Sequence, residues 1–232
     1  MSDGSTTASG QIRTNESSDR PAGARAKLRA VAVAVGLLLA GLVVSIVFGV
    51  VFTVPLLLFG SDLTGSFEFL ALAAAGQIGF LAVGVAYVRR TGGVTVRWPT
   101  PRDLAYAGGG VLAALGLVLG LSIVAAAAGV APESSVFDDP IAQDPTLALG
   151  LAALSIVLVA PAEELLFRGA IQGRLRRSFG PVAAIAGASL IFGSIHVVNF
   201  GGSVVGALVG VATITVGGAV FGTVYERTRN LV

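Results

Sequence analysis

Six long apolar stretches, separated by short polar segments, restrict this 232-residue chain to a membrane-embedded fold. A transmembrane helix needs about 20 consecutive, mainly apolar residues. The suitable stretches lie near residues 30–59, 67–88, 104–131, 146–173, 181–199 and 203–225. We therefore predict an all-α, polytopic membrane helix bundle of about six transmembrane helices. Pro55, near the end of the first stretch, predicts a kink or a break there.

Composition excludes most other classes of protein. Charged residues make up 12% of the chain, against about 25% in an average soluble domain, and the mean hydropathy is +0.87. The absence of cysteine excludes thiolate catalysis, iron–sulfur clusters and disulfides. A single histidine excludes a zinc site that needs two histidines from this chain. The net charge of +2, with no basic tract interleaved with aromatic residues, argues against nucleic acid as a partner.

The basic residues fall on one side of the predicted bundle. They precede the first stretch, connect the second to the third, end the fourth and follow the sixth, whereas the opposite connections hold only acidic charges. Because cytoplasmic loops are enriched in Lys and Arg, we expect a multi-pass protein of the plasma membrane with a cytoplasmic N-terminus. Residues 1–27 are expected to form a disordered tail. Residues 28–145 then form the N-terminal transmembrane helices, and residues 146–232 a separate domain.

Four ionisable residues lie well inside the apolar stretches, namely Glu163, Glu164, Arg168 and His196. One acidic residue at the middle of a membrane helix costs roughly 2.5–3.5 kcal/mol on insertion scales, so two adjacent carboxylates imply a role. Glu164 and Arg168 are four residues apart and are expected to pair on one helical face. Glu163 is turned about 100° away from Glu164 and has no basic partner on its own helix, which makes it a candidate general base.

The next turn is expected to bring Glu163 and His196 to the same depth. Ser178-Phe179-Gly180-Pro181 predicts a break between the fourth and fifth helices. Glu163 lies 17 residues before Gly180 and His196 lies 16 residues after it. In an antiparallel hairpin both then lie roughly 25 Å from the turn. Phe192, one turn before His196, is expected to line the resulting pocket, and Asn199 is a weaker candidate for the same place.

A carboxylate and an imidazole that face each other in a dry cavity can activate water. The carboxylate takes the proton, and the imidazole orients the water or stabilises the developing oxyanion. Alternatively both side chains hold a metal such as zinc, although catalytic zinc normally has three protein ligands, which favours a metal-free reaction. Two further interpretations remain open. Glu164 and Arg168 form a purely structural ion pair, or the intramembrane polar groups form the ion pathway of a small transporter.

Glu163-Glu164-x-x-x-Arg168, followed by Phe192-x-x-x-His196, resembles the first two motifs of the CPBP family of intramembrane proteases. This family contains the type II CAAX prenyl proteases and the Abi bacteriocin-immunity proteins, and the resemblance covers about residues 150–230. It implies a membrane-embedded endopeptidase, classed as a metalloprotease, in which Glu163 and His196 are catalytic and Glu164 and Arg168 support them. It also implies a membrane-associated or prenylated peptide or protein as substrate.

Family members carry a third motif, of the His-x-x-x-Asn type, on a further helix that the 232 residues do not contain. We therefore expect a C-terminally short member of the family. A non-catalytic pseudoprotease or immunity protein is kept as the alternative function, and a small transporter is the less favoured one.

Overall fold

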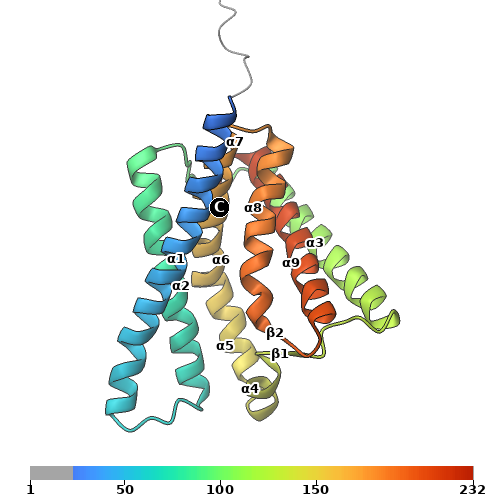
Figure 1. Cartoon of the computed structure of the whole chain (residues 1–232). Helices are drawn as coiled ribbons and strands as arrows, with labels where there is room; N and C mark the ends of the chain where they lie inside the picture. The colour runs from blue at the N-terminus through green and yellow to red at the C-terminus, as the bar shows by residue number, and fades with distance from the viewer. Residues whose placement is uncertain (1–22, 232) are drawn as a thin grey trace, which may run out of the picture.

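The computed structural model of the protein describes residues 23–231 and is built almost entirely of helices (Figure 1). In chain order the elements are α1 (Ala24–Leu58), α2 (Ser66–Thr91), α3 (Pro101–Ala127), β1 (Ser134–Ser135), α4 (Asp138–Gln143), α5 (Leu147–Leu154), η1 (Ser155–Val159), α6 (Ala160–Glu163), η2 (Glu164–Gln172), α7 (Gly173–Arg176), α8 (Pro181–Ile195), η3 (His196–Asn199), β2 (Phe200–Gly201) and α9 (Val204–Thr228). Six helical segments are long and apolar enough to span a membrane, which confirms the predicted all-α, multi-pass bundle.

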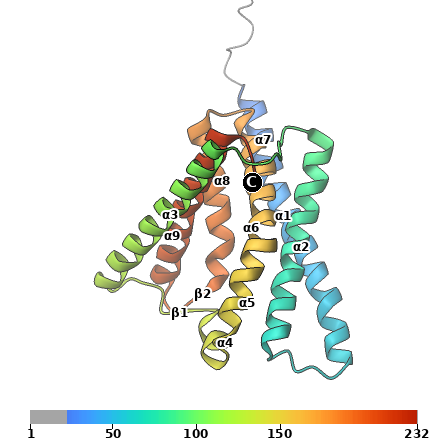
Figure 2. The same ribbon diagram turned by 180° about the vertical axis from the view of Figure 1, so that it is seen from behind.

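The fourth membrane segment, from α5 through α7, forms the centre of the bundle. Helices α1 and α2 pack on one side of it, and α8 packs on the other with α9 and α3 behind, as Figures 1 and 2 show from opposite directions. Successive segments alternate in direction, so the connections gather at two ends. One end carries the start of α1, the α2–α3 connection and α7, and the other carries α4, β1 and β2.

The buried core surrounds the second half of the central segment. Within this cluster the fully buried apolar side chains are those of Ala30, Ala34, Ala162, Leu166, Phe167, Ala170, Ile171, Ala184 and Ala188, from α1, α6, η2 and α8. Large apolar side chains elsewhere are exposed, among them Leu39, Val43 and Ile46 of α1. In water such a surface would cause aggregation, whereas in a bilayer it faces lipid. The exposed faces therefore support a membrane location.

Local signals explain where several helices begin. Thr100 and Asp103 form a capping box at the start of α3, and the Ser203 hydroxyl accepts the Gly206 N–H at the start of α9. The predicted break at Ser178–Pro181 is confirmed, since α7 ends at Arg176 and α8 begins at Pro181.

Two expectations about α1 need correction. Residues 1–22 of the expected tail lie outside the described residues, but residues 24–27 are helical, because Ala, Arg and Lys are good helix formers that extend the apolar stretch. Of the kink or break predicted at Pro55, the break is wrong, because the helix continues to Leu58. A proline this close to the helix end removes only one backbone hydrogen bond near the last turn.

A set of polar contacts joins the elements at the end that carries α4. The two-residue strands β1 and β2 pair antiparallel, with Ser134 opposite Gly201. The Ser66 hydroxyl at the start of α2 donates to Asp144 Oδ2 at 2.5 Å, and Thr146 donates to Asp144 Oδ1 through both its hydroxyl and its backbone N–H. These hydrogen bonds hold the pKa of the Asp144 carboxyl below its usual value, and the bond from Ser66 has the largest effect. Asp144 thus joins α2 to α5 in its ionised form.

Small residues allow α1 and α2 to approach closely. Ser45 Oγ donates to the Gly76 carbonyl at 2.6 Å, and Gly79 lies directly against the Ser45 backbone. Small residues also allow close packing in α9, where Gly218 faces Phe192 of α8 and Gly222 faces Gln172 of η2. Glycine at these positions therefore sets the distance between neighbouring helices.

Replacing Gly79 with valine is expected to destabilise the protein by about 1–3 kcal/mol, because the added side chain would overlap the Ser45 backbone. The melting temperature in detergent micelles measures the effect. Gly49→Val is the matched control, since it adds the same side chain to α1 where no atom lies within 4 Å. Equal melting temperatures for the two variants would contradict this packing of α1 on α2.

Candidate active site

Glu163 lies at a point where the central segment changes its winding. The four-residue helix α6 ends at Glu163, and wider turns with i→i+5 hydrogen bonds precede it in η1 and follow it in η2. Pro161 has no N–H, and in a regular α-helix its ring would clash with the carbonyl of Val157, within η1. The wider turn of η1 relieves this clash. Wide turns of this kind are frequent at functional sites.

A cavity of about 620 Å³ lies beside Glu163, within the bundle. Its polar lining residues are Gln77, Ser155, Glu163, His196 and Asn199, and its apolar lining residues are Leu42, Ala73, Phe80, Phe137, Leu151, Leu154, Val159, Ile195 and Ile214. The structure thus brings the predicted pair Glu163 and His196 to one cavity, together with Asn199. This agrees with the hairpin predicted from the sequence, in which Glu163 and His196 lie at the same distance from the turn.

Gln77 of α2 is a polar neighbour of Glu163 that the sequence analysis missed. Its side-chain amide donates from Nε2 to Glu163 Oε1 at 3.3 Å. Charge is what singled out Glu163 and His196 in the sequence, and a neutral amide has none. The signal was nevertheless present, because Gln77 is the one amide side chain in the long apolar helix α2. An amide there holds one oxygen of the carboxylate in place.

Phe192 contacts the imidazole of His196 through both its backbone carbonyl and its ring. The Nδ1 atom of His196 lies 2.8 Å from the Phe192 carbonyl oxygen, and the two rings meet edge to face with centroids 4.7 Å apart. A carbonyl only accepts hydrogen bonds, so Nδ1 carries the proton in this contact. In a neutral imidazole Nε2 is then left with its lone pair. Phe192 orients His196 but is not among the residues that line the cavity, which corrects the expectation that it would do so.

Edge-to-face contacts between aromatic rings continue from Phe192 to α2. Phe167 packs against Phe192 with centroids 5.0 Å apart, and Phe80 packs against Phe167 at 6.1 Å. Phe80 also lines the cavity. The imidazole of His196 is therefore connected to α2 by three rings, which fix its position relative to the helix that carries Gln77.

Glu164 and Arg168 lie away from the cavity. Arg168 Nε is 3.4 Å from Glu164 Oε1, which confirms the predicted pairing at a distance typical of an ion pair rather than a short hydrogen bond. The side chain of Arg168 is 1% exposed, and its guanidinium carbon lies 5.3 Å from the centroid of the Phe192 ring. Arg168 thus supports Phe192, and through it His196, while Glu164 lines a separate small cavity with Asp103 and Tyr225.

The residues around the cavity do not fit a metal centre. Among residues 23–231, no three side chains of His, Asp or Glu come together in a way that would hold a metal ion. Glu163 and His196 supply two ligands from the cavity, and catalytic zinc normally takes three from the protein. The donor set of the cavity is therefore one ligand short of a catalytic zinc site.

A known protein family matches the region of the chain that carries both candidate catalytic residues. Residues 145–232 match the family model of the type II CAAX prenyl endopeptidases, described as Rce1-like. No curated protein and no solved structure matches the chain. The matched region contains Glu163, Glu164, Arg168, Phe192 and His196, whereas Gln77 and the rest of α1 and α2 lie outside it. The part of this membrane protein that carries both candidate catalytic residues is therefore similar to the Rce1-like type II CAAX prenyl endopeptidases.

Proposed function

We propose that the chain is an endopeptidase that hydrolyses a peptide bond inside the membrane, with water activated by Glu163 and His196. The observation that carries the proposal is that both side chains line one cavity within the bundle. The family match of residues 145–232 supports the same reaction class. A membrane-anchored peptide or protein is the substrate class that such a cavity can receive from the bilayer.

In the proposed reaction the Glu163 carboxylate removes a proton from a water molecule as the water attacks the scissile carbonyl. A C–O bond forms, the C–N bond of the substrate breaks, and the proton passes from Glu163 to the leaving amine. Water is thereby added across the peptide bond without any other reactant.

Phe192 determines the role of His196 in this scheme. With Nδ1 donating to the Phe192 carbonyl, the lone pair of Nε2 accepts a hydrogen bond from the attacking water and orients it. The geometry favours this role over the stabilisation of an oxyanion, because a neutral imidazole has no second N–H to donate. Asn199 lines the same cavity, and its side-chain amide supplies a donor for the oxyanion.

The same proposal places the protein in the plasma membrane with its N-terminus in the cytoplasm. Apart from Arg168, the described Lys and Arg lie at the helix ends and connections of the end where α1 begins. The excess of Lys and Arg in cytoplasmic loops supports this orientation.

Gln77→Leu is expected to lower kcat roughly 10- to 150-fold with little change in KM, since a hydrogen bond to a charged group is worth about 1.5–3 kcal/mol. Among residues 23–231, the change removes the only hydrogen bond given to Glu163 Oε1. Cleavage of a reconstituted membrane peptide, with kcat and KM determined separately, measures the effect. Gln143→Leu is the control, because Gln143 lies in α4 and does not line the cavity. A change in KM alone would contradict the positioning role of Gln77.

A further inference from the structure

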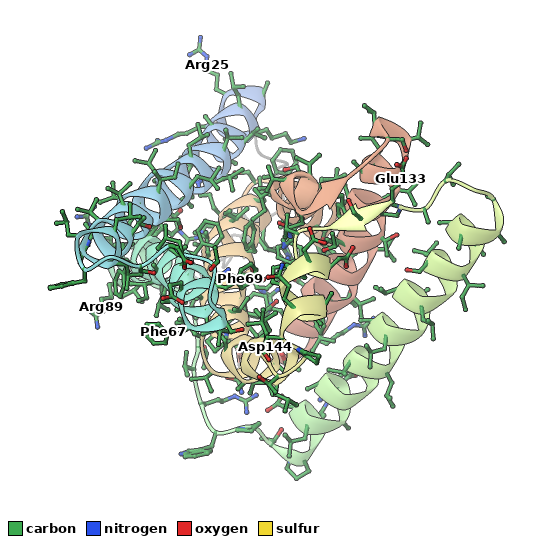
Figure 3. The ribbon with its side chains drawn as sticks, turned by 90° about the horizontal axis from the view of Figure 1, so that it is seen from below. Arg25, Phe67, Phe69, Arg89, Glu133 and Asp144 are labelled. Carbon is green, nitrogen blue, oxygen red and sulfur yellow. The ribbon has the colours of Figure 1, made fainter. Side chains whose placement is uncertain are left out.

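A second, smaller cavity of about 170 Å³ lies where three membrane segments end. Its walls come from the ends of α2 and α9 and from the last turns of the central segment, in η2 and α7. Figure 3 views the bundle from the opposite end, where Phe67 and Asp144 are labelled. Among residues 23–231, this cavity shares no lining residue with the one that holds Glu163 and His196. Because membrane helices end at the lipid headgroups, the second cavity lies at headgroup depth.

Positive charge is concentrated around this second cavity. Four arginines line it, namely Arg174, Arg176, Arg177 and Arg229. Arg176 Nε lies 2.7 Å from Glu226 Oε1, and Arg229 pairs with the same oxygen. Four positive charges thus face one negative charge, which leaves a net charge of +3 on the lining arginines and their partner. Since like charges repel at short range, a bound anion would relieve the repulsion among these arginines.

The four arginines do not simply cap the helix ends. Arginine near the end of a helix often donates to the last carbonyls. Within the described part of the chain, only Arg177 contacts such a carbonyl, through Nη2 to Gly92 at 3.5 Å, which is longer than a normal hydrogen bond. Arg174 donates instead to the Ser178 hydroxyl. Each guanidinium has five N–H groups, and most of them stay available for a ligand.

Two further lining residues favour a ligand in this cavity. Gly173 leaves space, because a Cβ atom there would meet only the Arg168 carbonyl oxygen, at 3.8 Å. Tyr225 lines both this cavity and the small one beside Glu164, and its side chain is only 6% exposed. In the structure of residues 23–231, its hydroxyl takes part in no hydrogen bond. Polar groups of largely buried side chains usually have a partner, which an oxygen atom of a ligand would supply.

We propose that this second cavity binds a phosphate group, carried by an anionic lipid or by a soluble phosphate compound. The planar fork of arginine matches phosphate oxygens, and basic pockets between membrane helices bind the phosphates of anionic lipids. The volume of the cavity equals that of roughly six liquid water molecules, enough for one phosphate group. The bound group joins the ends of α2, the central segment and α9. The proposal does not depend on the proposed protease reaction.

Three variants of the 232-residue chain test the proposal in an uncharged, phosphate-free detergent. Arg174→Gln removes one charge from the cavity and leaves both pairs of Glu226 intact. Gly173→Leu keeps every charge but fills the space. Arg89→Gln is the control, since Arg89 does not line the cavity and points away from the bundle (Figure 3). The probes are phosphatidylglycerol, inorganic phosphate and, as a zwitterionic reference, phosphatidylcholine. Native mass spectrometry measures lipid binding, and the melting temperature reports on each probe.

We expect wild type and Arg89→Gln to bind phosphatidylglycerol or inorganic phosphate equally well, and Arg174→Gln and Gly173→Leu to bind it at least roughly tenfold more weakly, since each lost hydrogen bond is to a charged group. Stabilisation by phosphatidylglycerol but not by inorganic phosphate would identify a lipid as the source. Stabilisation by inorganic phosphate, with the same dependence on the two cavity variants, would show that the phosphate group alone is recognised.

Four results would overturn the proposal. The first is that neither phosphatidylglycerol nor inorganic phosphate binds, and the second is that phosphatidylcholine binds as tightly as phosphatidylglycerol when inorganic phosphate does not bind. The third is an equal loss of affinity in Arg89→Gln and Arg174→Gln, because the attraction would then come from the overall charge of this end. The fourth is wild-type affinity in Arg174→Gln or in a folded Gly173→Leu, because the ligand would then lie outside the cavity. Arg174→Gln keeps the test decisive if Gly173→Leu does not fold.

Discussion

Glu163→Gln is expected to abolish proteolysis, with a loss in kcat of roughly 10²–10⁴-fold, the usual contribution of a general base. Glutamine has the same shape and accepts the hydrogen bond from Gln77 through its carbonyl oxygen, but it cannot take a proton from water. The fold should be unaffected. Mass-spectrometric mapping of new protein termini in the membrane fraction of expressing cells measures cleavage even while the substrate is unidentified.

Glu133→Gln is the matched control for this experiment. Glu133 lies in the loop before β1 and accepts a hydrogen bond from the Ser203 N–H, which glutamine can also accept. Termini produced by wild type and by Glu133→Gln, and missing with Glu163→Gln, would identify the substrates. If Glu163→Gln yields the same termini as wild type, the mechanism is wrong. If the Glu163→Gln variant also leaves the cellular phenotype unchanged, a non-catalytic immunity protein becomes the better hypothesis. A transporter would instead be identified by ion flux into liposomes that contain the protein.

Arg168→Met is expected to cost about 3–5 kcal/mol of stability, the usual loss when one partner of a buried ion pair is removed. The side chain of Arg168 is 1% exposed and is the partner that the structure gives to Glu164. Its loss leaves the Glu164 carboxylate without a compensating charge inside the bilayer and removes the cation from the Phe192 ring. Thermal unfolding in detergent micelles measures the loss.

A second variant keeps this prediction testable if Arg168→Met does not fold. Glu164→Gln combined with Arg168→Met removes both charges, so no uncompensated carboxylate remains and most of the stability should return. Because Phe192 loses its contact with the guanidinium in both variants, the difference between them isolates the charge of Glu164. If Arg168→Met alone melts at the wild-type temperature, the ion pair contributes nothing to the fold.

The arrangement of helices could be predicted from the sequence because lipid leaves few alternatives. A long apolar stretch must be a helix when no water is present to bind its backbone, and the predicted fourth stretch, 146–173, agrees closely with the observed Leu147–Arg176. The wide turns on either side of Glu163 could not be predicted. They depend on the fit of Pro161 and its neighbours into the surrounding helices, and periodicity gives no signal for them.

The candidate site was predictable where its residues carry charge and unpredictable where it is built from neutral groups. Glu163 and His196 stood out because ionisable residues are costly in a membrane, and residue counting brought them to one depth. Gln77 has no charge, and nothing in the sequence related α2 to the fourth segment. The prediction that Phe192 lines the pocket was also wrong, because its ring contacts Phe167, Arg168 and His196.

The origin of the cavity walls has a consequence for how specificity can diverge. The region that matches the family, residues 145–232, contributes Glu163 and His196, but Leu42, Gln77 and Phe80 come from α1 and α2 outside it. Substitutions in those two helices can reshape the space offered to a substrate while the reacting groups stay in place. Two proteins with identical motifs can therefore cleave unrelated targets. The motifs alone would not distinguish such proteins, because the residues that differ lie in α1 and α2.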